Sequence, residues 1–328
     1  MGYTVAREEL ERLEPEWRAL LPRASASNVF ASPTWLRVWW QEFGPPEAGE
    51  LILLSVRRGG ELVGVAPLMR EGDTICFAGD TEICDYMDFI AARGEEEAVV
   101  AAVLRSLSEE PWDRLVLWAV PEGSPTLLAL QSAAAGFGLR VDVETEDVCP
   151  QLELPATWDD YLATLDKKDR HELRRKLRKL SQGGAVILEA IGDPVAVQAA
   201  LDDFLRLYRI SRTDKAEFMT EQMERFFRAI VAALVAEGRL ELIFLTLGGV
   251  RTAAVICFKE DGEELLYNSG YDPAYAHLSV GLLSKALALQ KAIDEGKSRF
   301  DFLRGREHYK YDLGARDVAV YRCTVRRN

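Results

Sequence analysis

Two stretches of the chain repeat one pattern, in which a two-glycine turn joins two apolar runs. The first stretch is LILLSVRRGGELVGVAPL (residues 51–68), and the second is LELIFLTLGGVRTAAVICF (residues 240–258). Apolar, β-favouring runs joined by two glycines are typical of β-hairpins. We therefore expect two copies of one supersecondary unit. A single doubly wound sheet is disfavoured, because it needs a helix between successive strands and these turns leave no room for one.

The elements expected after each hairpin follow one order, which is strand, helix and strand. The first half places them at residues 74–78, 95–107 and 114–120, and the second at residues 264–268, 281–295 and 299–303. This order predicts an α+β (mixed α/β) fold, in which each copy is a mixed, mostly antiparallel sheet flanked by helices. Because 328 residues exceed the usual size of one domain, we expect two domains with separate cores, residues 1–150 and 151–328.

The composition argues against several classes of protein. Asp and Glu number 53 against 40 Lys and Arg, so the net charge of −13 disfavours DNA binding. No stretch approaches the roughly 18 continuous apolar residues of a membrane span, and the first residues lack the apolar core of a signal peptide. The five cysteines are scattered, which indicates reduced and mostly buried thiols, and the three histidines show no metal-binding spacing. We expect a cytoplasmic enzyme with no transmembrane segment and no metal.

A strongly basic helix is expected between the two copies, with its charge concentrated at residues 166–180. Its apolar face consists of Leu173, Leu177 and Leu180, and Arg and Lys crowd the other faces. Such a helix is either a solvated face or an anion site for the phosphates of a nucleotide, a coenzyme, a tRNA or a lipid. Arg174 and Arg178 are the candidate phosphate ligands. Two more helices are expected at residues 195–211 and 220–237, and the polar loop between them, residues 212–215, is a candidate border of a substrate groove.

An unusual density of ionisable residues marks the run SRFDFLRGREHYKYDL (residues 298–313). Its alternating aromatic and polar residues predict that the run begins as a short, half-buried strand. Gly305 permits a turn where the strand ends, and Arg304, Arg306 and Lys310 stand around that turn. Charged side chains just past the C-terminal end of a strand are typical of ligand sites in α/β sheets, although a salt-bridged surface loop has the same composition.

Several motifs follow one another along the second half. They are Tyr271-Asp272-Pro273, Leu278-Ser279-Val280-Gly281-Leu282-Leu283, Asp294-Glu295-Gly296, Asp301-Phe302-Leu303-Arg304-Gly305 and Tyr309-Lys310. In the order and spacing of these motifs the chain resembles the CelD/BcsL-like acyltransferases, which belong to the GNAT superfamily and are related to the FemAB aminoacyltransferases. The resemblance implies two tandem GNAT-like domains and an N-acyltransferase.

The resemblance also implies what the enzyme binds. We expect acyl-CoA as a co-substrate, with no tightly bound cofactor, and an amine acceptor on an amino sugar, an amino lipid or a peptide. An aminoacyl-tRNA donor is one alternative. A non-catalytic module that binds an anionic partner is the other.

In the resembled family, the fourth strand of the domain diverges from the fifth and exposes its backbone to the thioester. Here that strand is residues 264–270, and the following helix begins near Gly281, where a helix N-terminus suits a pyrophosphate. The candidate coenzyme ligands are Asn268, Ser279, Val280 and Gly281, together with Arg174 and Arg178. The candidate catalytic residues are Lys310, Tyr309, Asp301 and Tyr271. Lys310 is expected to stabilise the transfer intermediate, and Asp301 to anchor the loop that follows its strand.

The first domain is expected to hold the acceptor, and the second to form most of the active cleft. The motif Asp85-Tyr86-Met87-Asp88 is similar to one that the resembled family often shows, and its two carboxylates beside a phenol suit the binding and deprotonation of an amine. A structural role for this motif is the alternative. The candidate substrate ligands are Asp85, Tyr86, Asp88, Arg304 and Arg306.

Overall fold

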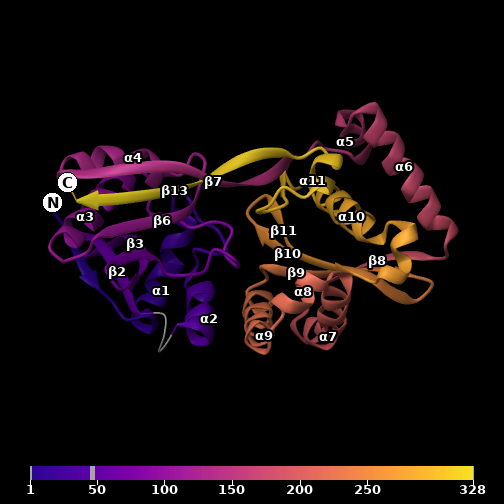
Figure 1. Ribbon diagram of the computed structural model, residues 1–328, viewed down its shortest axis with the longest axis horizontal. Helices are drawn as coiled ribbons and strands as arrows, with labels where there is room; N and C mark the ends of the chain where they lie inside the picture. The colour runs from indigo at the N-terminus through magenta and orange to yellow at the C-terminus, as the bar shows by residue number, and fades with distance from the viewer. Residues whose placement is uncertain (1, 45–48, 328) are drawn as a thin grey trace. The chain divides into compact units, whose positions relative to one another are not determined.

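The computed structural model describes residues 2–44 and 49–327 and divides the chain into two compact units (Figure 1). Unit 1 comprises the residues up to Val148 together with those from Val318 onward, and unit 2 comprises Cys149–Asp317. The expected division assigned the last strand of the chain to the second domain. That strand joins unit 1 instead, because its hydrogen-bonding partner is a strand of unit 1.

Unit 1 is built on one mixed sheet with the strand order β1-β2-β3-β4-β6-β13-β7. The strands are β1 (Tyr3–Arg7), β2 (Glu50–Arg58), β3 (Glu61–Glu71), β4 (Thr74–Phe77), β5 (Ile90–Ala91), β6 (Arg114–Pro121), β7 (Leu139–Glu153) and β13 (Arg316–Arg327). The helices are α1 (Leu10–Leu20), the short η1 (Leu21–Arg23), α2 (Pro33–Phe43), α3 (Glu96–Ser108) and α4 (Pro125–Ala135). Strands β1 to β4 run antiparallel in turn, β4 and β6 run parallel, and β6 and β13 run antiparallel.

Unit 2 is built on a second mixed run of strands in the order β7-β12-β11-β10-β9-β8, in which the last residues of β7 form one edge. Its other strands are β8 (Val186–Ile191), β9 (Leu240–Leu247), β10 (Val250–Glu260), β11 (Glu263–Tyr271) and β12 (Arg299–Asp301). The helices are α5 (Trp158–Thr164), α6 (Lys167–Gln182), α7 (Pro194–Ser211), α8 (Thr213–Phe218), α9 (Glu221–Ala236), the 3-10 helix η2 (Pro273–Leu278), α10 (Val280–Asp294) and α11 (His308–Asp312).

The two units repeat one strand plan, as the paired hairpins predict. Strands β1 to β4 correspond to β8 to β11, since each set is antiparallel in turn. In each unit the fourth strand then pairs in parallel with the next, β4 with β6 and β11 with β12, and that strand pairs antiparallel with a last one. The prediction of two repeated units with mixed, mostly antiparallel sheets is therefore confirmed.

Local sequence signals account for the start of helix α2. The hydroxyl of Ser32 accepts a hydrogen bond from the amide of Trp35 (3.2 Å), and Pro33 occupies the first helical position. Trp35 and Trp39 lie one turn apart and are both buried. Both tryptophans are therefore part of the core of unit 1, in agreement with their helical spacing.

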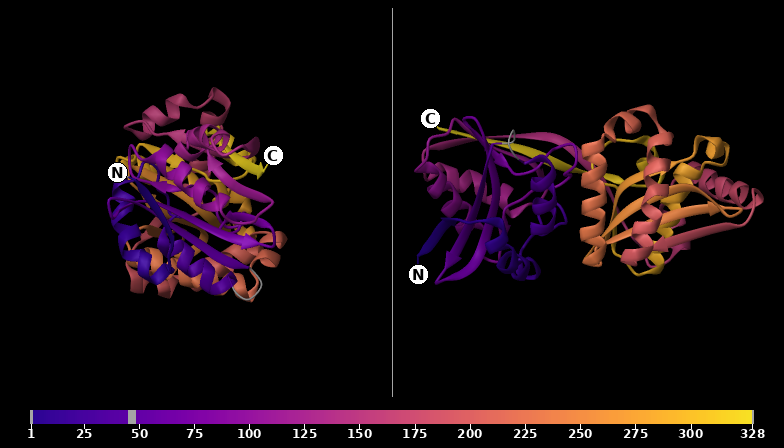
Figure 2. Two further views of the ribbon diagram at one scale, coloured as in Figure 1. Left: turned by 90° about the vertical axis from the view of Figure 1, so that its left-hand side faces the viewer. Right: turned by 90° about the horizontal axis from the view of Figure 1, so that it is seen from below.

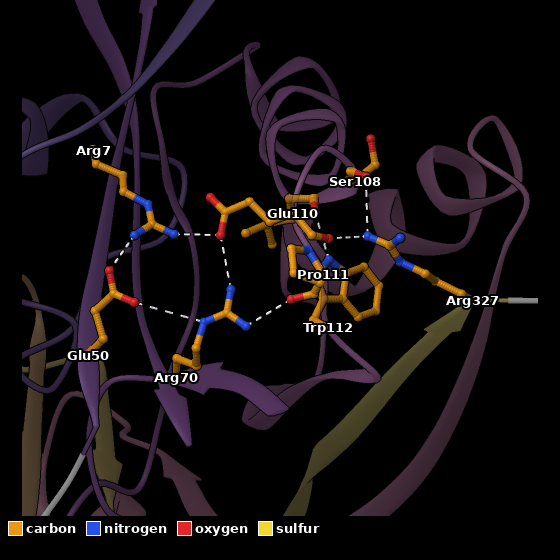
Figure 3. A network of polar contacts seen from close by, with 9 residues as sticks. Arg7, Glu50, Arg70, Ser108, Glu110, Pro111, Trp112 and Arg327 are labelled. Atoms are coloured by element: carbon orange, nitrogen blue, oxygen red, sulfur yellow. Dashed lines mark hydrogen bonds and ion pairs between the residues drawn. The ribbon is translucent and has the colours of Figure 1, made fainter. Parts of the chain in front are cut away.

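A network of hydrogen bonds and ion pairs holds the last strand in unit 1 (Figure 3). The guanidinium of Arg327 donates to the carbonyl oxygens of Ser108 and Glu110 at the end of α3, and it lies 5.0 Å from the ring centroid of Trp112. The carboxylate of Glu110 in turn accepts from Arg70 of β3 (3.0 Å). These contacts join β13 to α3 and β3, and they place the end of the described chain within unit 1.

Helices cover both faces of the sheet in unit 2. Helices α7 and α9 pack on one face, and α10, with α5 and α6 against it, packs on the other, as Figures 1 and 2 show. Gly270 of β11 allows a close approach of α7, because a Cβ atom there would lie 2.4 Å from the amide nitrogen of Tyr208. Residues 158–180 form two helices, α5 and α6, where one basic helix was expected. The expected loop at residues 212–215 is mostly helix α8.

Candidate active site

Strands β11 and β12 diverge after a short parallel pairing. Their register joins only Glu263 to Arg299, Glu264 to Phe300 and Leu265 to Asp301. Strand β11 nevertheless continues to Tyr271, held on its other side by β10. Beyond Asp301 the chain turns away through Leu303, whose φ of 55° is left-handed. The end of β11 therefore presents its backbone edge toward an opening, which is the geometry that the resemblance implies for the fourth strand.

A cavity of about 430 Å³ lies at this opening, entirely within unit 2. The end of β11, the start of α10 and helix α11 contribute candidate residues to its wall. Those that line the cavity are Tyr271, Ser279, Gly281 and Tyr309. Asn268 and Val280 do not line it, and the side chain of Val280 is fully buried.

The start of α10 forms one side of the cavity. Its N-cap, Ser279, adopts a left-handed conformation with φ of 59°. A Cβ atom on Gly281 would lie 2.8 Å from Cδ1 of Tyr271, so only glycine lets this ring lie against the helix start. The first N–H groups of a helix have no acceptor within the helix and carry a partial positive charge. This side of the cavity is suited to an anionic group.

Two lysines that the sequence did not single out as site residues, Lys215 of α8 and Lys285 of α10, reach the same cavity. The ammonium of Lys215 donates to the carbonyl oxygen of Ser269 (2.5 Å), on the free edge of β11. That of Lys285 donates to the carbonyl oxygen of Gly281 (2.6 Å). Burial, with a smaller effect of the nearby Arg212, lowers the pKa of Lys215 to about 8. Burial and the charge of Lys215 lower the pKa of Lys285 to about 7.

The ammonium of Lys310 is hydrogen-bonded to the loop that precedes it. Its side chain is 1% exposed, and its ammonium donates to the carbonyl oxygens of Leu303 (2.9 Å), Arg304 (2.8 Å) and Gly305 (3.0 Å). A carboxylate oxygen of Glu307 lies 2.9 Å away. An ammonium has three hydrogens, and the loop takes up all of them. Lys310 therefore stabilises this loop, and its loss is expected to lower the stability of the protein. Its catalytic role stays a prediction.

Asp301 and Tyr309 also shape this loop. The carboxylate of Asp301 accepts from the amide of Leu303 (2.7 Å) and from the side chain of Gln151 (3.0 Å), which anchors the turn as expected. The ring of Tyr309 lies 4.8 Å from the ammonium of Lys285. Burial, with a smaller effect of the charge of Glu307, raises the pKa of the Tyr309 phenol well above its usual value. The phenol is therefore neutral across the physiological range.

The basic helix contributes a different residue from those expected. Arg174 and Arg178 are exposed and do not line the cavity, whereas Lys176 does. The reason is the phase of α6: its buried positions Leu173 and Leu180 turn Lys176 toward the cavity and the two arginines toward solvent. Two further candidates, Arg304 and Arg306, lie on the loop after β12 and do not line the cavity either.

The acidic motif lies in unit 1 and is largely interior. Tyr86 and Asp88 are buried, and Asp88 is 1% exposed. The hydroxyl of Ser124, at the start of α4, donates to the carboxylate of Asp88 (2.7 Å). Burial raises the pKa of Asp88 to about 6. These contacts favour the structural alternative for Tyr86 and Asp88, while Asp85 is partly exposed.

Some cavity residues that were not predicted are nevertheless marked by weak signals in the sequence. Lys285 interrupts the apolar helix run VGLLSKALALQKAI at a buried position, which is a detectable anomaly. The polar segment at residues 212–215 was placed at a groove border, and Arg212 and Lys215 do line the cavity. The spacing of α6 also carries a signal, since Lys176 lies three residues after Leu173 and four before Leu180, on the same face of the helix.

Two kinds of feature are absent from the described residues, 2–44 and 49–327. None of their helices is both long enough and apolar enough to span a bilayer. No group of three or more His, Cys, Asp or Glu side chains among them is placed to hold a metal ion.

Comparison with protein families identifies most of unit 2. Residues 167–311 match the family described as an acetyltransferase (GNAT) domain. The matched range contains β11, α10, α11 and every residue named above as lining the cavity. No curated protein matches the chain.

Solved structures share the fold across almost the whole chain. FemX is 12% identical and has a TM-score of 0.66. The match covers 98% of this chain and 96% of FemX. A second similar structure is the C-terminal domain of a putative lysylphosphatidylglycerol synthetase from Agrobacterium fabrum. It is 10% identical and has a TM-score of 0.62, and the match covers 96% of this chain and 92% of that domain. L-PGS from Bacillus licheniformis is 11% identical, with a TM-score of 0.57. The match covers 92% of this chain and 95% of L-PGS.

The family match and the diverging strands agree on the class of protein. A non-catalytic binding module, the second alternative from the sequence, is not supported by a GNAT domain that keeps an open cavity at the divergence. The chain is an acyltransferase, and its residues 167–311 match the family described as an acetyltransferase (GNAT) domain.

Proposed function

We propose that this acyltransferase transfers an acyl group from acyl-CoA to an amine, and that the reaction takes place in the cavity of unit 2. The observation that carries the proposal is the divergence of β11 from β12 beside the start of α10. The free edge of β11 can hydrogen-bond the donor, and the helix start and the nearby cations suit its phosphates. We expect the reaction in the cytoplasm, with an amine acceptor on a sugar, a lipid or a peptide.

The charge of the cavity supports an anionic donor. The cations Lys176, Arg212 and Lys215 line it, against the single carboxylate of Glu307. This excess of cations lies in a protein whose net charge is −13. Cations gathered at one cavity of an acidic protein favour the local binding of phosphates.

Acyl transfer asks little more of the protein than positioning and charge stabilisation. The amine nitrogen attacks the thioester carbonyl, whose oxygen becomes an oxyanion, and the intermediate then expels the thiolate to leave an amide. The ammonium of Lys215 at the free edge of β11 is placed to stabilise negative charge there. The nitrogen loses its protons during the reaction, so a base is also required.

Binding of coenzyme A tests this proposal. We expect coenzyme A to raise the melting temperature of the native protein, because it binds only the folded state. A Gly281→Val variant fills the space between the start of α10 and Tyr271 and should lose most of this shift. Arg174→Gln, on the exposed face of α6, is the matched control and should keep it. Absence of any shift with coenzyme A, or of acyl transfer from any acyl-CoA by mass spectrometry, would contradict the proposal.

An aminoacyl-tRNA donor is the second candidate, and the outer face of α6 favours it. The helix carries eight Lys and Arg against one Asp and one Glu, and Arg174 and Arg178 point to solvent. Cations that lie outside the cavity but next to it suit a donor much larger than coenzyme A. We expect tRNA binding, if it occurs, to weaken steeply with salt and to be reduced by Arg174→Gln and Arg178→Gln. Coenzyme A binding should not respond to these two changes.

A further inference from the structure

Lys285 is an unusual residue for the position that it occupies. It lies on the buried face of α10, is 7% exposed, and lines the cavity. Its ammonium nitrogen is 2.6 Å from the carbonyl oxygen of Gly281 on its own helix. Within the described part of the chain, no carboxylate lies within 4.0 Å of this nitrogen. A lysine buried without a carboxylate partner costs free energy when charged.

The groups that face Lys285 add to this cost. Lys215 comes from α8 and Lys310 from α11, and the positive charge of each disfavours a proton on Lys285. Among residues 2–44 and 49–327, the one carboxylate that opposes them is that of Glu307, which forms an ion pair with Lys310 (2.9 Å). Lys176 and Arg212 also line the cavity. Burial and the neighbouring cations therefore favour the free amine at neutral pH, in agreement with a pKa of about 7.

We propose that Lys285, as a free amine in the cavity, is the base that accepts the proton lost by the acceptor during acyl transfer. The inference rests on the function proposed above and assigns one step of it. The acceptor enters as an ammonium ion and gives one proton to Nζ of Lys285. The resulting free amine attacks the thioester carbonyl, and the C–N bond forms. As the C–S bond breaks, the second proton on the attacking nitrogen passes to the leaving thiolate. The Lys285 ammonium then releases its proton to water, so the balance is an amide, a thiol and one proton.

The other ionisable groups of the cavity are less suited to this step. The phenol of Tyr309 has a raised pKa and seldom exists as a phenolate. The carboxylate of Glu307 is engaged by Lys310. Lys215 holds its proton more firmly than Lys285, with a pKa of about 8, and donates it to the strand edge. Lys215 therefore supplies the positive charge, while Lys285 supplies the basic nitrogen.

A nucleophilic role for Lys285 is disfavoured by the chemistry of its product. Attack of Nζ on the thioester would leave an acyl-lysine, which is an amide as stable as the final product. Such an intermediate would not pass its acyl group to a second amine. Accumulation of acylated Lys285 during turnover is therefore not expected.

The titration of Lys285 can be measured without any substrate. We would label the lysines of the native protein with 13C at Cε and follow their NMR signals with pH, using Lys285→Met to assign the signal. The expected midpoint for Lys285 is near pH 7. A midpoint above pH 9 would mean that the residue is charged throughout the physiological range, and it would overturn the inference.

Kinetics provide the second test, with acetyl-CoA and benzylamine as first probes and other donors if these fail. We expect Lys285→Met to lower kcat by about a hundredfold or more, the usual scale for loss of a general base. In this variant the increase of kcat/KM with pH near pH 7 should disappear, while the shift in melting temperature caused by coenzyme A remains. Lys285→Arg, which keeps the charge but cannot release a proton, should be equally impaired. Lys215→Met is the control: it should lower kcat but keep a rising limb in the pH profile.

The outcomes separate the two proposals. If the native protein is active and Lys285→Met keeps its turnover and its pH profile, this inference fails and the proposed function stands. Native protein that transfers no acyl group from any acyl-CoA or aminoacyl-tRNA would overturn the proposed function, and the inference with it. Circular dichroism of each variant shows whether lost activity reflects lost folding.

Discussion

Two buried lysines of unit 2, Lys285 and Lys310, and the partly buried Lys215 differ in what surrounds them. Lys310 lies among three carbonyl oxygens and a carboxylate, so its charge is compensated. Lys215 and Lys285 each contact one carbonyl oxygen and line a cavity. At the scale of single residues, the number of polar partners decides whether a buried lysine stabilises a loop or remains available for chemistry.

Replacing Lys310 is expected to destabilise the protein. In Lys310→Met the carbonyl oxygens of residues 303–305 lose their donor, and three charge-assisted hydrogen bonds disappear. We expect a loss of roughly 2–5 kcal/mol in the free energy of unfolding, measured by urea denaturation. Lys179→Met is the matched control, since this exposed lysine donates to a single carbonyl, that of His277. An equal and small effect of both changes would show that the Lys310 contacts add little.

Replacing Lys285 is expected to have the opposite effect on stability. Its pKa is about 7 in the folded protein against 10.5 as its reference value, so between these pH values the unfolded chain binds more protons. This difference makes the stability of the native protein rise from pH 7 to pH 10.5. Lys285→Met removes this contribution and should therefore raise stability most below pH 7. Urea denaturation at pH 6 and pH 9 checks this, and Lys285→Arg, which stays charged, should show no gain.

At the scale of elements, the position of α7 on β11 depends on one glycine. A Cβ atom at Gly270 would lie 2.4 Å from the amide nitrogen of Tyr208 and 2.5 Å from the carbonyl carbon of Leu207. Because both are backbone atoms, the helix itself must move, and we expect Gly270→Ala to cost roughly 1–3 kcal/mol of unfolding free energy. Gly192→Ala is the control, since its nearest contact would be an ordinary 3.6 Å. Equal stability of both variants would contradict this account.

The elements also show how far the sequence predicts the structure. The two-glycine turns predicted both hairpins, because such turns are a local signal. Helix α8 was expected as a loop, since its six residues are mostly polar and its fold depends on α7. The surroundings of Lys285 were not predictable, because they come from α8 and α11, elements distant in sequence.

At the scale of the whole molecule, the last strand completes the first sheet. Strand β13 lies between β6 and β7, and its side chains Val320, Cys323 and Val325 are fully buried. We expect a chain that ends at Asp317 to lose hydrogen-exchange protection in β6 and α3, while β9 and β10 of unit 2 stay protected. Mass spectrometry of exchanged peptides measures both. Unchanged protection of β6 would mean that the strand adds little to the core of unit 1.

Unit 1 is formed by two separate segments of the chain, and this affects its folding during synthesis on the ribosome. Unit 2 is continuous, whereas the strand that completes unit 1 is made only after it. At about 5–20 residues per second, the stretch from Cys149 to Asp317 takes on the order of 10–30 s to translate. During this interval the sheet of unit 1 has an empty position between β6 and β7. The nascent chain therefore completes its GNAT domain before its N-terminal unit, although the N-terminal unit is the first to be translated.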